Sequence, residues 1–219
     1  MTEPSHKYPR THHLLWSDTI GPDGDHVLAD VSVFAGQEIV VTEKLDGENT
    51  TLYASHLHAR SVDSRHHPSR DRVKALHARL AHFIPSGFRI SGENCFAKHS
   101  IAYNALPAHF IVFGVWEEQT CLSWDETEAF ITDLEQRSGE RIPLAPLLYR
   151  GIWDEKRVKA LQIGASSFGG AQEGYGVRLA RNILLAEWHN SIAKYVRPNH
   201  VQSGKHWMFA PIVPNELAR

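Results

Sequence analysis

Residues 38–49 read EIVVTEKLDGEN, and the lysine inside this stretch decides how the rest of the chain is interpreted. The apolar residues 39–41 are β-branched, which is typical of a buried strand, and Lys44 stands at the end of that run. The Asp-Gly pair that follows has the chemistry of a turn, and a second strand is predicted at residues 50–57, TTLYASHL. Because a buried ammonium without a partner is costly, we expect Lys44 to have a specific chemical use.

The composition is that of an ordinary globular protein, with 219 residues, of which 42 % are hydrophobic and 22 % are charged. This length favours one domain over residues 1–219. No apolar run reaches the length of a membrane span, and the first ten residues, MTEPSHKYPR, lack the hydrophobic core of a signal peptide. The two cysteines, Cys95 and Cys121, have no metal-type spacing and suit a reducing compartment. We therefore expect a cytoplasmic protein without membrane contact.

The net charge of −2 does not predict a general electrostatic attraction to nucleic acid. Arginine and lysine are concentrated locally between residues 60 and 79. This segment predicts either a nucleic-acid contact or the solvated face of a helix, and the sequence leaves both interpretations open.

The remaining pattern predicts an α+β fold. Residues 69–85 have apolar positions at helical spacing, with Ser69 as the expected N-cap and Pro85 at the end. Ser123 and Glu126 form a capping box for a helix over residues 123–139, and a shorter helix is expected at 154–164. Further strands are predicted at residues 88–94, 109–117, 173–180 and 190–197. Because strands and helices do not alternate regularly, we predict largely antiparallel sheets flanked by helices, and not a doubly wound parallel sheet.

Lys44 is a candidate nucleophile. A lysine attacks only as the free amine, so its surroundings must help it to lose a proton. A strand end beside a glycine provides partial burial and allows a bulky ligand to approach the backbone. An aspartate lies two residues after the lysine and supplies a nearby carboxylate.

The stretch EKLDGEN at residues 43–49 resembles the first motif of the covalent nucleotidyltransferases, the superfamily of ATP-dependent ligases and mRNA capping enzymes. In that superfamily the lysine attacks the α-phosphate of a nucleotide. The resemblance implies that Lys44 is the nucleophile and that the neighbouring motif residues bind the nucleotide; these are Glu43, Asp46, Gly47 and Asn49.

Later motifs of the superfamily follow in the same order. Arg60 resembles the arginine that contacts the nucleotide or the 5′ phosphate, with Arg65 as the alternative. Glu93, in ISGEN, is similar to the glutamate that accepts hydrogen bonds from the ribose. Phe113 resembles the aromatic residue that stacks on the purine, with Trp116 as the alternative.

The last two motifs lie towards the end of the chain. Glu173, in QEGYGVRL, resembles the glutamate that helps to hold a divalent metal, and Lys194, in SIAKYVR, resembles the lysine that contacts the α-phosphate during catalysis. The superfamily usually has a second lysine two residues after Lys194, where this chain has Val196. Arg197 or Lys205 is expected to supply that charge instead.

The resemblance implies an ATP-dependent RNA ligase with a nucleotidyltransferase (ATP-grasp-like) domain. Such an enzyme forms a lysyl-AMP, transfers AMP to an RNA 5′ phosphate and seals that end to a 3′ hydroxyl, using ATP and Mg²⁺ or Mn²⁺. About 25 residues follow Lys194, too few for an appended oligonucleotide-binding barrel. RNA is the expected partner, together with either an end-healing kinase or phosphatase or no partner enzyme.

Three other interpretations remain open at this point. One is a DNA nick ligase, another is a capping-type enzyme that uses GTP, and the third is an inactive nucleic-acid-binding module. The choice among nicked duplex, single-strand and tRNA substrates is not predicted.

Overall fold

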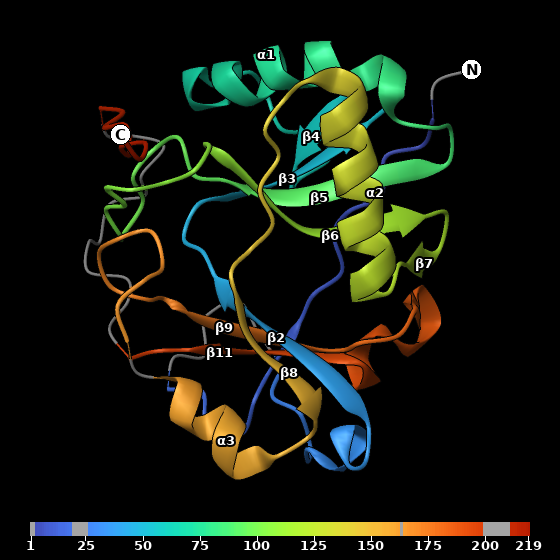
Figure 1. Ribbon diagram of the computed structural model, residues 1–219, viewed down its shortest axis with the longest axis vertical. Coiled ribbons are helices and arrows are strands. Elements are labelled where there is room, and N and C mark those ends of the chain that lie inside the picture. The colour runs from blue at the N-terminus through green and yellow to red at the C-terminus, as the bar shows by residue number, and fades with distance from the viewer. Residues whose placement is uncertain (1–2, 19–25, 163, 199–210) are drawn as a thin grey trace.

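A computed structural model describes residues 3–18, 26–162, 164–198 and 211–219, and all structural statements below concern these residues. They form two sheets (Figure 1). Sheet A has the strand order β1 (His12–His13), β11 (Ile192–Val196), β9 (Gly174–Leu179), β2 (Glu38–Lys44) and β8 (Leu147–Ile152). Sheet B has the strand order β10 (Ile183–Leu184), β7 (Thr120–Cys121), β6 (Phe110–Glu117), β5 (Phe88–Asn94), β3 (Glu48–Tyr53) and β4 (Leu57–Ala59).

The helices cover the outer sides of the two sheets. In Figure 1, α1 (Asp71–Leu80) and α2 (Trp124–Ser138) lie against sheet B, and α3 (Glu155–Lys159) lies at the far end of sheet A. Short 3₁₀ helices occur at η1 (Ser32–Phe34), η2 (Pro68–Arg70), η3 (Ala81–Phe83), η4 (Ala160–Gln162) and η5 (Leu185–Asn190). Apart from the parallel pair β1 and β11, the strands within each sheet pair antiparallel. The predicted α+β class with largely antiparallel sheets is confirmed.

The buried residues form several hydrophobic clusters, and the one below sheet A also includes Trp116 of sheet B. Between sheet B and its helices, Val73 and Leu80 of α1 and Ile131 and Leu134 of α2 pack with buried residues of β3, β5 and β6. The core of sheet A includes Ile39 and other residues of β2, β9 and β11. A smaller cluster lies beside the end of β2 and contains Leu45, Tyr103 and Ile111, with Phe113 and Phe168 packed against it. This third cluster supports the region between the sheets.

The connection from β2 to β3, where the Asp-Gly pair predicted a turn, joins two different sheets and does not form a hairpin. β2 pairs with β8 and β9 in sheet A, whereas β3 pairs with β4 and β5 in sheet B. The Asp-Gly pair therefore carries the chain from one sheet to the other. Local turn chemistry does not specify which strand becomes the partner, because pairing depends on the whole sheet. As a result, Lys44 is the last residue of β2 in sheet A, and Glu48 is the first residue of β3 in sheet B.

Several predicted boundaries also change. The predicted strand 50–57 is divided between β3 and β4, which pair with each other. Ser69 is not the N-cap of α1; it lies inside η2, where the His67 side chain accepts from the Ser69 backbone N–H. The strand expected to begin at residue 190 begins at Ile192. Edge strand β8 was not predicted, because its side chains are half-buried or exposed and it contains a glycine at position 151.

Other local predictions are confirmed. The Ser123 and Glu126 capping box is present at the start of α2, and Gly139 ends that helix in the left-handed conformation with φ 71°. The Asp154 side chain accepts from the Arg157 N–H and caps α3, which continues into η4 within the predicted range. These features depend on residues close together in sequence, so they could be read locally.

The N-terminal segment crosses both sheets. The His6 N–H donates to the Tyr53 hydroxyl of β3 in sheet B at 2.8 Å. Farther along, the Leu14 N–H donates to the Lys194 carbonyl of β11 in sheet A, also at 2.8 Å. Between these points the Tyr8 ring lies against Phe113, with ring centroids 5.2 Å apart. This segment therefore connects the two sheets. In Figure 1 it is the dark blue trace that passes behind them.

Candidate active site

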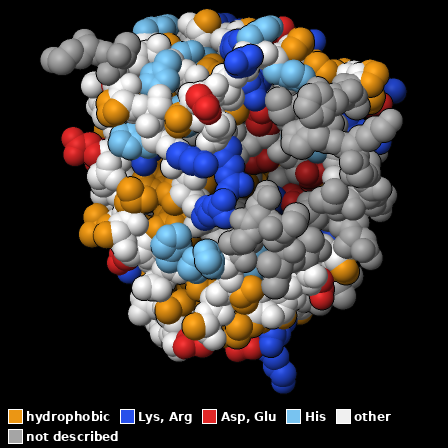
Figure 2. Space-filling model, turned by 180° about the vertical axis from the view of Figure 1, so that it is seen from behind, with side chains coloured by type: hydrophobic (Ala, Val, Ile, Leu, Met, Phe, Trp, Pro, Cys, Tyr) orange, Lys and Arg blue, Asp and Glu red, His pale blue; other side chains and the backbone are white. Residues whose placement is uncertain are grey.

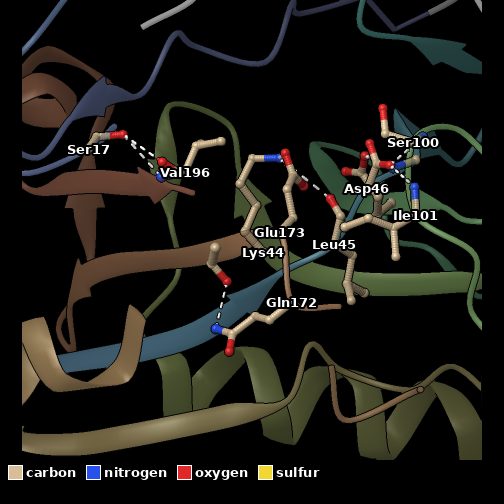
Figure 3. Close-up of polar contacts among 12 residues, drawn as sticks. Ser17, Lys44, Leu45, Asp46, Ser100, Ile101, Gln172, Glu173 and Val196 are labelled. Carbon is tan, nitrogen blue, oxygen red and sulfur yellow. Dashed lines mark hydrogen bonds and ion pairs between the residues drawn. The ribbon is translucent and has the colours of Figure 1, made fainter. Parts of the chain in front are cut away.

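The end of β2 brings Lys44 against a glutamate from a distant part of the chain. Lys44 Nζ donates to both carboxylate oxygens of Glu173, at 2.7 Å to Oε1 and 2.6 Å to Oε2. The Lys44 side chain is 32 % exposed, whereas that of Glu173 is only 3 % exposed. Figure 3 shows the two side chains meeting end to end. The lysine is thus held by a buried carboxylate and still accessible from outside.

The register of sheet A explains this pairing. Lys44 lies opposite Gly174 of β9, and Glu173 immediately precedes that glycine. Two residues further along the sheet, Thr42 pairs with Gly176, and Gly176 in turn lies opposite Lys194 of β11. Because β9 has glycine at both positions, these two positions place no side chain between the lysines of β2 and β11. Lys194 lies close enough to Glu173 to affect the pKa of that carboxyl.

The charges of the site shift the pKa of Lys44 in a definite direction. Burial alone lowers the pKa of the amine, but the carboxylates of Glu173 and Glu93 outweigh burial and raise the pKa above the usual lysine value. Lys44 is therefore an ammonium ion in this state. Attack by this amine requires that the proton first leave.

In both glutamates, burial and Lys44 shift the pKa in opposite directions. Burial raises the pKa of Glu93 to about 8, with Lys44 opposing the rise. Burial likewise raises the pKa of Glu173 to about 7, again with Lys44 opposing it. Carboxylates crowded together in a buried place favour a proton or a cation. The site therefore has an electrostatic preference for additional positive charge.

Asp46 and Gly47 hold the architecture around the lysine. Asp46 Oδ2 accepts from the backbone N–H groups of Ser100 and Ile101, both at 2.7 Å, and Figure 3 shows this carboxylate turned towards that loop. A side chain at Gly47 would place its Cβ 2.7 Å from the Asn94 carbonyl oxygen. Glycine is thus required here for close packing against β5. The Gly47 N–H also donates to Glu93 Oε1 at 3.0 Å, which links the motif to sheet B.

Glu43 and Asn49 each have a buried acceptor oxygen to which no described residue donates. Glu43 is 3 % exposed, and its Oε2 accepts from the Ser167 N–H at 2.9 Å. Glu43 Oε1 and Asn49 Oδ1 are buried and have no hydrogen-bond partner among the described residues. Asn49 lies opposite Glu93 in the β3 and β5 pair. Buried acceptors without donors are costly, so a bound donor group would stabilise them.

The aromatic candidates differ in exposure. Phe113 is half-buried beside the small cluster near the end of β2, with Tyr8 against it edge-on. Trp116, the alternative, is fully buried, and the Arg89 guanidinium lies over its ring. Only Phe113 of these two has an exposed surface on which a base can stack.

The remaining basic candidates occupy different places. Arg60 and Arg65 are both exposed after β4, so the structure gives neither a closer relation to the site. The Arg197 N–H donates to the Glu173 carbonyl at 3.0 Å, which places Arg197 beside that glutamate. Lys205 lies outside the described residues.

Comparisons with known proteins identify the family of this chain. A family model described as RNA ligase matches residues 37–196, which is more than half of the chain and contains β2, β5, β9 and β11. The chain belongs to the RNA ligase family.

Solved RNA ligase structures have a similar fold. An unliganded mutant of the Naegleria gruberi RNA ligase superposes with a TM-score of 0.60 and 16 % identity, covering 78 % of this chain and 52 % of that one. A mutant of the same enzyme with ATP and Mn gives 0.59 and 16 %, with coverages of 91 % and 63 %. Its complex with PPi gives 0.57 and 16 %, with coverages of 89 % and 61 %. No curated protein gives a significant match.

This RNA ligase family chain spans between about half and five-eighths of the length of those solved relatives. At such low identity, the likeness to them establishes the fold alone. None of the helices in the described residues is both long and apolar enough to cross a membrane.

An ion pair near the motif was missed by sequence reasoning. Arg70 donates from Nε to Glu48 Oε2 at 2.6 Å and from Nη2 to Glu48 Oε1 at 2.5 Å. Both side chains are largely buried, at 5 % and 11 % exposure. The pair fastens the beginning of β3 to the start of α1 in this RNA ligase fold. The signal available in the sequence was a charged residue at the start of a largely buried strand.

Replacing Glu93 with glutamine is expected to stabilise the protein in a pH-dependent manner. The folded-state pKa of Glu93 is raised to about 8, so the wild type loses stability as pH rises from the unfolded value near 4.5 through about 8. Glutamine keeps an acceptor for the Gly47 N–H and carries no charge. We expect no gain at pH 4 and a gain of a few kcal/mol above pH 8.

Thermal unfolding at a series of pH values measures this effect. Glu117→Gln, at an exposed position of β6, serves as the matched control and is expected to show no such trend. A constant difference between Glu93→Gln and wild type across pH would contradict the assignment of a destabilising buried charge.

Proposed function

We propose that this chain is an ATP-dependent RNA ligase whose Lys44 carries AMP between ATP and an RNA end. The observation that carries the proposal is the pairing of an accessible Lys44 with buried Glu173, beside Glu93 and Lys194. Membership in the RNA ligase family supports it. We further propose that residues 1–219 act as one adenylyltransferase domain of the nucleotidyltransferase (ATP-grasp-like) type.

The first step begins with a proton transfer. Glu173 is the carboxylate in hydrogen-bond contact with the Lys44 amine, so it takes the proton that attack requires. Lys44 Nζ then bonds to the α-phosphorus of ATP, and the bond from that phosphorus to the pyrophosphate oxygen breaks. Lys194, reaching over the glycines of β9, offsets charge on the phosphate.

The nucleoside is held from sheet B and from β2. Glu93 accepts from the ribose hydroxyls, and Phe113 stacks on the base. The unpaired Glu43 Oε1 and Asn49 Oδ1 suit the exocyclic amine of adenine, which donates, better than the corresponding carbonyl of guanine. This difference in hydrogen-bonding chemistry favours ATP over GTP, and solved relatives are described with ATP and Mn.

The next two steps transfer AMP and close the RNA. An oxygen of the RNA 5′ phosphate attacks the phosphorus of the lysyl-AMP, and the Lys44 nitrogen leaves and regains a proton. A 3′ hydroxyl oxygen then attacks the 5′ phosphate and AMP departs, leaving a phosphodiester. Arg60 and Arg197 are proposed to contact phosphates of the nucleotide or RNA.

A divalent metal fits the donor set. The described residues contain no group of three or more His, Cys, Asp or Glu side chains arranged for a metal ion. Mg²⁺ and Mn²⁺ suit hard oxygen ligands, and Mg²⁺ commonly uses one or two carboxylates together with substrate phosphates. Glu173 is the residue that would hold the metal, through the carboxylate oxygen that does not take the Lys44 proton, because burial among carboxylates already favours added positive charge there. When bound, the metal neutralises charge on the phosphates.

Mass spectrometry of the protein after incubation with ATP and Mg²⁺ tests the proposal. We expect one added adenylate, mapped by peptide analysis to Lys44, and no guanylate with GTP. The adenylated protein is then given 5′-phosphorylated RNA or DNA ends, with transfer expected to RNA. Transfer to DNA alone supports a nick ligase, a guanylate supports a capping-type enzyme, and no adduct supports an inactive binding module.

Gly176→Ala is expected to slow the first step without harming the fold. A Cβ at Gly176 meets only Thr42 Oγ1, at 3.9 Å, which is ordinary contact. The methyl group would nevertheless occupy the space over Gly176, between β2 and β11. We expect an unchanged or slightly higher Tm and a rate of lysyl-AMP formation lower by about tenfold.

Gly174→Ala provides the contrast. Its Cβ would lie 2.0 Å from the Tyr195 carbonyl oxygen, so this change is expected to disrupt the pairing of β9 with β11 and lower Tm. Tm and the single-turnover rate are measured for both variants. Wild-type rates in a well-folded Gly176→Ala protein would show that the phosphates do not bind over Gly176.

A further inference from the structure

The C-terminal segment, residues 213–218, packs along the loop that follows β5, residues 95–106. We call this loop the β5 loop. Backbone hydrogen bonds between 2.8 and 3.0 Å join the two segments: Lys98 N–H to the Val213 carbonyl, Asn215 N–H to that of Phe96, Glu216 N–H to that of Tyr103, and Ala218 N–H to that of Leu106. Figure 1 shows the red C-terminal segment beside this loop. The proposed nucleotide site uses no residue of either segment.

The Asn215 side chain joins two distant parts of the β5 loop. Its Oδ1 accepts from the Tyr103 N–H at 2.9 Å, and its Nδ2 donates to the Cys95 carbonyl at 2.8 Å. The amide is buried, so the loss of either bond would leave a polar backbone group without its partner. Asn215 therefore holds the β5 loop in one conformation.

The Tyr103 hydroxyl reaches from this loop to the motif of the nucleophile. Its oxygen accepts from the Asp46 N–H at 2.8 Å. That N–H belongs to the same planar peptide group as the Leu45 carbonyl. The Leu45 carbonyl oxygen lies 3.5 Å from Lys44 Nζ, and Figure 3 shows it turned towards the amine. Because the peptide group is rigid, a hydroxyl that fixes its N–H side also fixes the carbonyl beside Lys44.

The β5 loop holds Asp46 by its side chain as well. The Ser100 and Ile101 N–H groups both donate to Asp46 Oδ2. Burial is the main cause of a raised pKa at Tyr103, and the Glu173 carboxylate adds to the rise. Tyr103 is thus close enough to the candidate active site to be affected by its charge, and its hydroxyl stays protonated and neutral.

Tyr103 and Asn215 are not part of the surface that meets a substrate. Figure 2 shows the face opposite the view of Figure 1, where Lys and Arg side chains lie along the middle and Asp and Glu side chains lie in a hollow to one side. Tyr103 is 1 % exposed and Asn215 is 5 % exposed, so they add almost no area to any face. A change at either residue should therefore alter how Lys44 is held, and substrate binding should depend on other groups.

We propose that the Tyr103 hydroxyl and the Asn215 side chain are positioning residues that hold the Lys44 amine in the orientation required for attack on ATP. This inference rests on the proposed function for the reaction at Lys44. Asn215 acts through Tyr103, and Tyr103 acts through the peptide group between Leu45 and Asp46. Neither residue accepts the Lys44 proton or touches the metal.

Tyr103→Phe in the full chain tests the hydroxyl. Phenylalanine keeps the ring in its cluster with Leu45 and Ile101 but leaves the Asp46 N–H without its acceptor. We expect the single-turnover rate of lysyl-AMP formation to fall about tenfold, with the ATP concentration for half-maximal rate unchanged. Sealing of an RNA already adenylated at its 5′ end bypasses Lys44 and should keep the wild-type rate. Equal losses in both reactions, or no loss in either, would overturn the proposal.

Asn215→Ala tests whether Asn215 acts through Tyr103. Alone, this change is expected to slow lysyl-AMP formation severalfold. Combined with Tyr103→Phe it should slow the reaction no further, because the hydroxyl that it positions is already absent. Full multiplication of the two losses in the double variant would show independent effects and would overturn the link between the two residues.

Tyr53→Phe is the matched control. The Tyr53 hydroxyl also accepts from a backbone N–H, that of His6, at 2.8 Å, and Tyr53 is likewise buried. We expect a similar decrease in Tm for Tyr53→Phe and Tyr103→Phe, but a wild-type rate of lysyl-AMP formation for Tyr53→Phe. A rate lowered equally in both variants would attribute the effect to lost stability and would count against positioning.

NMR of lysine side chains labelled with ¹³C at Cε follows the surroundings of Lys44 without ATP. The Lys44 signal should shift in Tyr103→Phe and keep its position in Tyr53→Phe. An unshifted Lys44 signal in Tyr103→Phe would contradict a positioning role. Absence of a lysyl adduct in the wild type would count against the ligase proposal, whereas the NMR comparison would still decide whether Tyr103 positions Lys44.

Discussion

Lys44→Arg is expected to abolish covalent labelling of the protein by ATP, with a loss of about a thousandfold or more. Arginine keeps the positive charge that pairs with buried Glu173, so the fold and its ion pair should persist. The guanidinium does not lose its proton in proteins and therefore cannot attack phosphorus. The measurement is transfer of radiolabelled AMP from ATP to the protein, with Tm as the test of folding.

Two comparisons make the Lys44 result specific. Lys98→Arg, at an exposed lysine near the loop that Asp46 holds, is the matched control and should keep wild-type labelling. An RNA already adenylated at its 5′ end bypasses Lys44, so the variant should still seal it. Undiminished labelling of Lys44→Arg would place the nucleophile elsewhere and defeat the proposal.

Glu173→Gln is expected to reduce the rate of lysyl-AMP formation by about a hundredfold or more. The glutamine is similar in size, but it cannot take a proton from Lys44 and is a weak ligand for Mg²⁺. Removing the carboxylate also removes the main electrostatic cause of the raised pKa of Lys44. We expect the loss of the proton acceptor to slow the reaction more than the easier deprotonation of Lys44 speeds it. Single-turnover rates with saturating ATP measure the balance.

The dependence of the rate of lysyl-AMP formation on pH tests whether Glu173 accepts the proton. The pKa of Glu173 is raised to about 7, so below that pH the carboxyl is protonated and cannot accept the Lys44 proton. The wild-type rate should rise through pH 7, and Glu173→Asp should keep a similar rise at a lower rate. Glu173→Gln should lose that rise. A glutamine variant with the wild-type rate and profile would show that this carboxylate is not the base.

The candidate site shows which predictions a sequence can support. Lys44 was expected at a strand end with a chemical use, and the structure places it there with Glu173 as its partner. Asp46 and Gly47 stay predicted nucleotide-site residues, and their observed contacts hold a loop and β5. The sequence indicated which residue types mattered but not what each of them touches.

The sequence by itself determined those features that depend only on residues close together along the chain. The capping box and terminal glycine of α2, the cap of α3 and the buried run before Lys44 are examples. Hydrogen bonds between residues three or four apart depend on local conformation alone, and the motif order supported the family assignment.

Only the tertiary structure decided which strands became partners. It separated β2 from β3 into different sheets, brought Lys44 to Glu173 across 129 positions, and placed Asn215 against Tyr103. Strand register sets these meetings, and register depends on how complete sheets bury their faces. A short stretch of sequence carries no record of that choice, so the chemical environment of Lys44 emerges only in the folded chain.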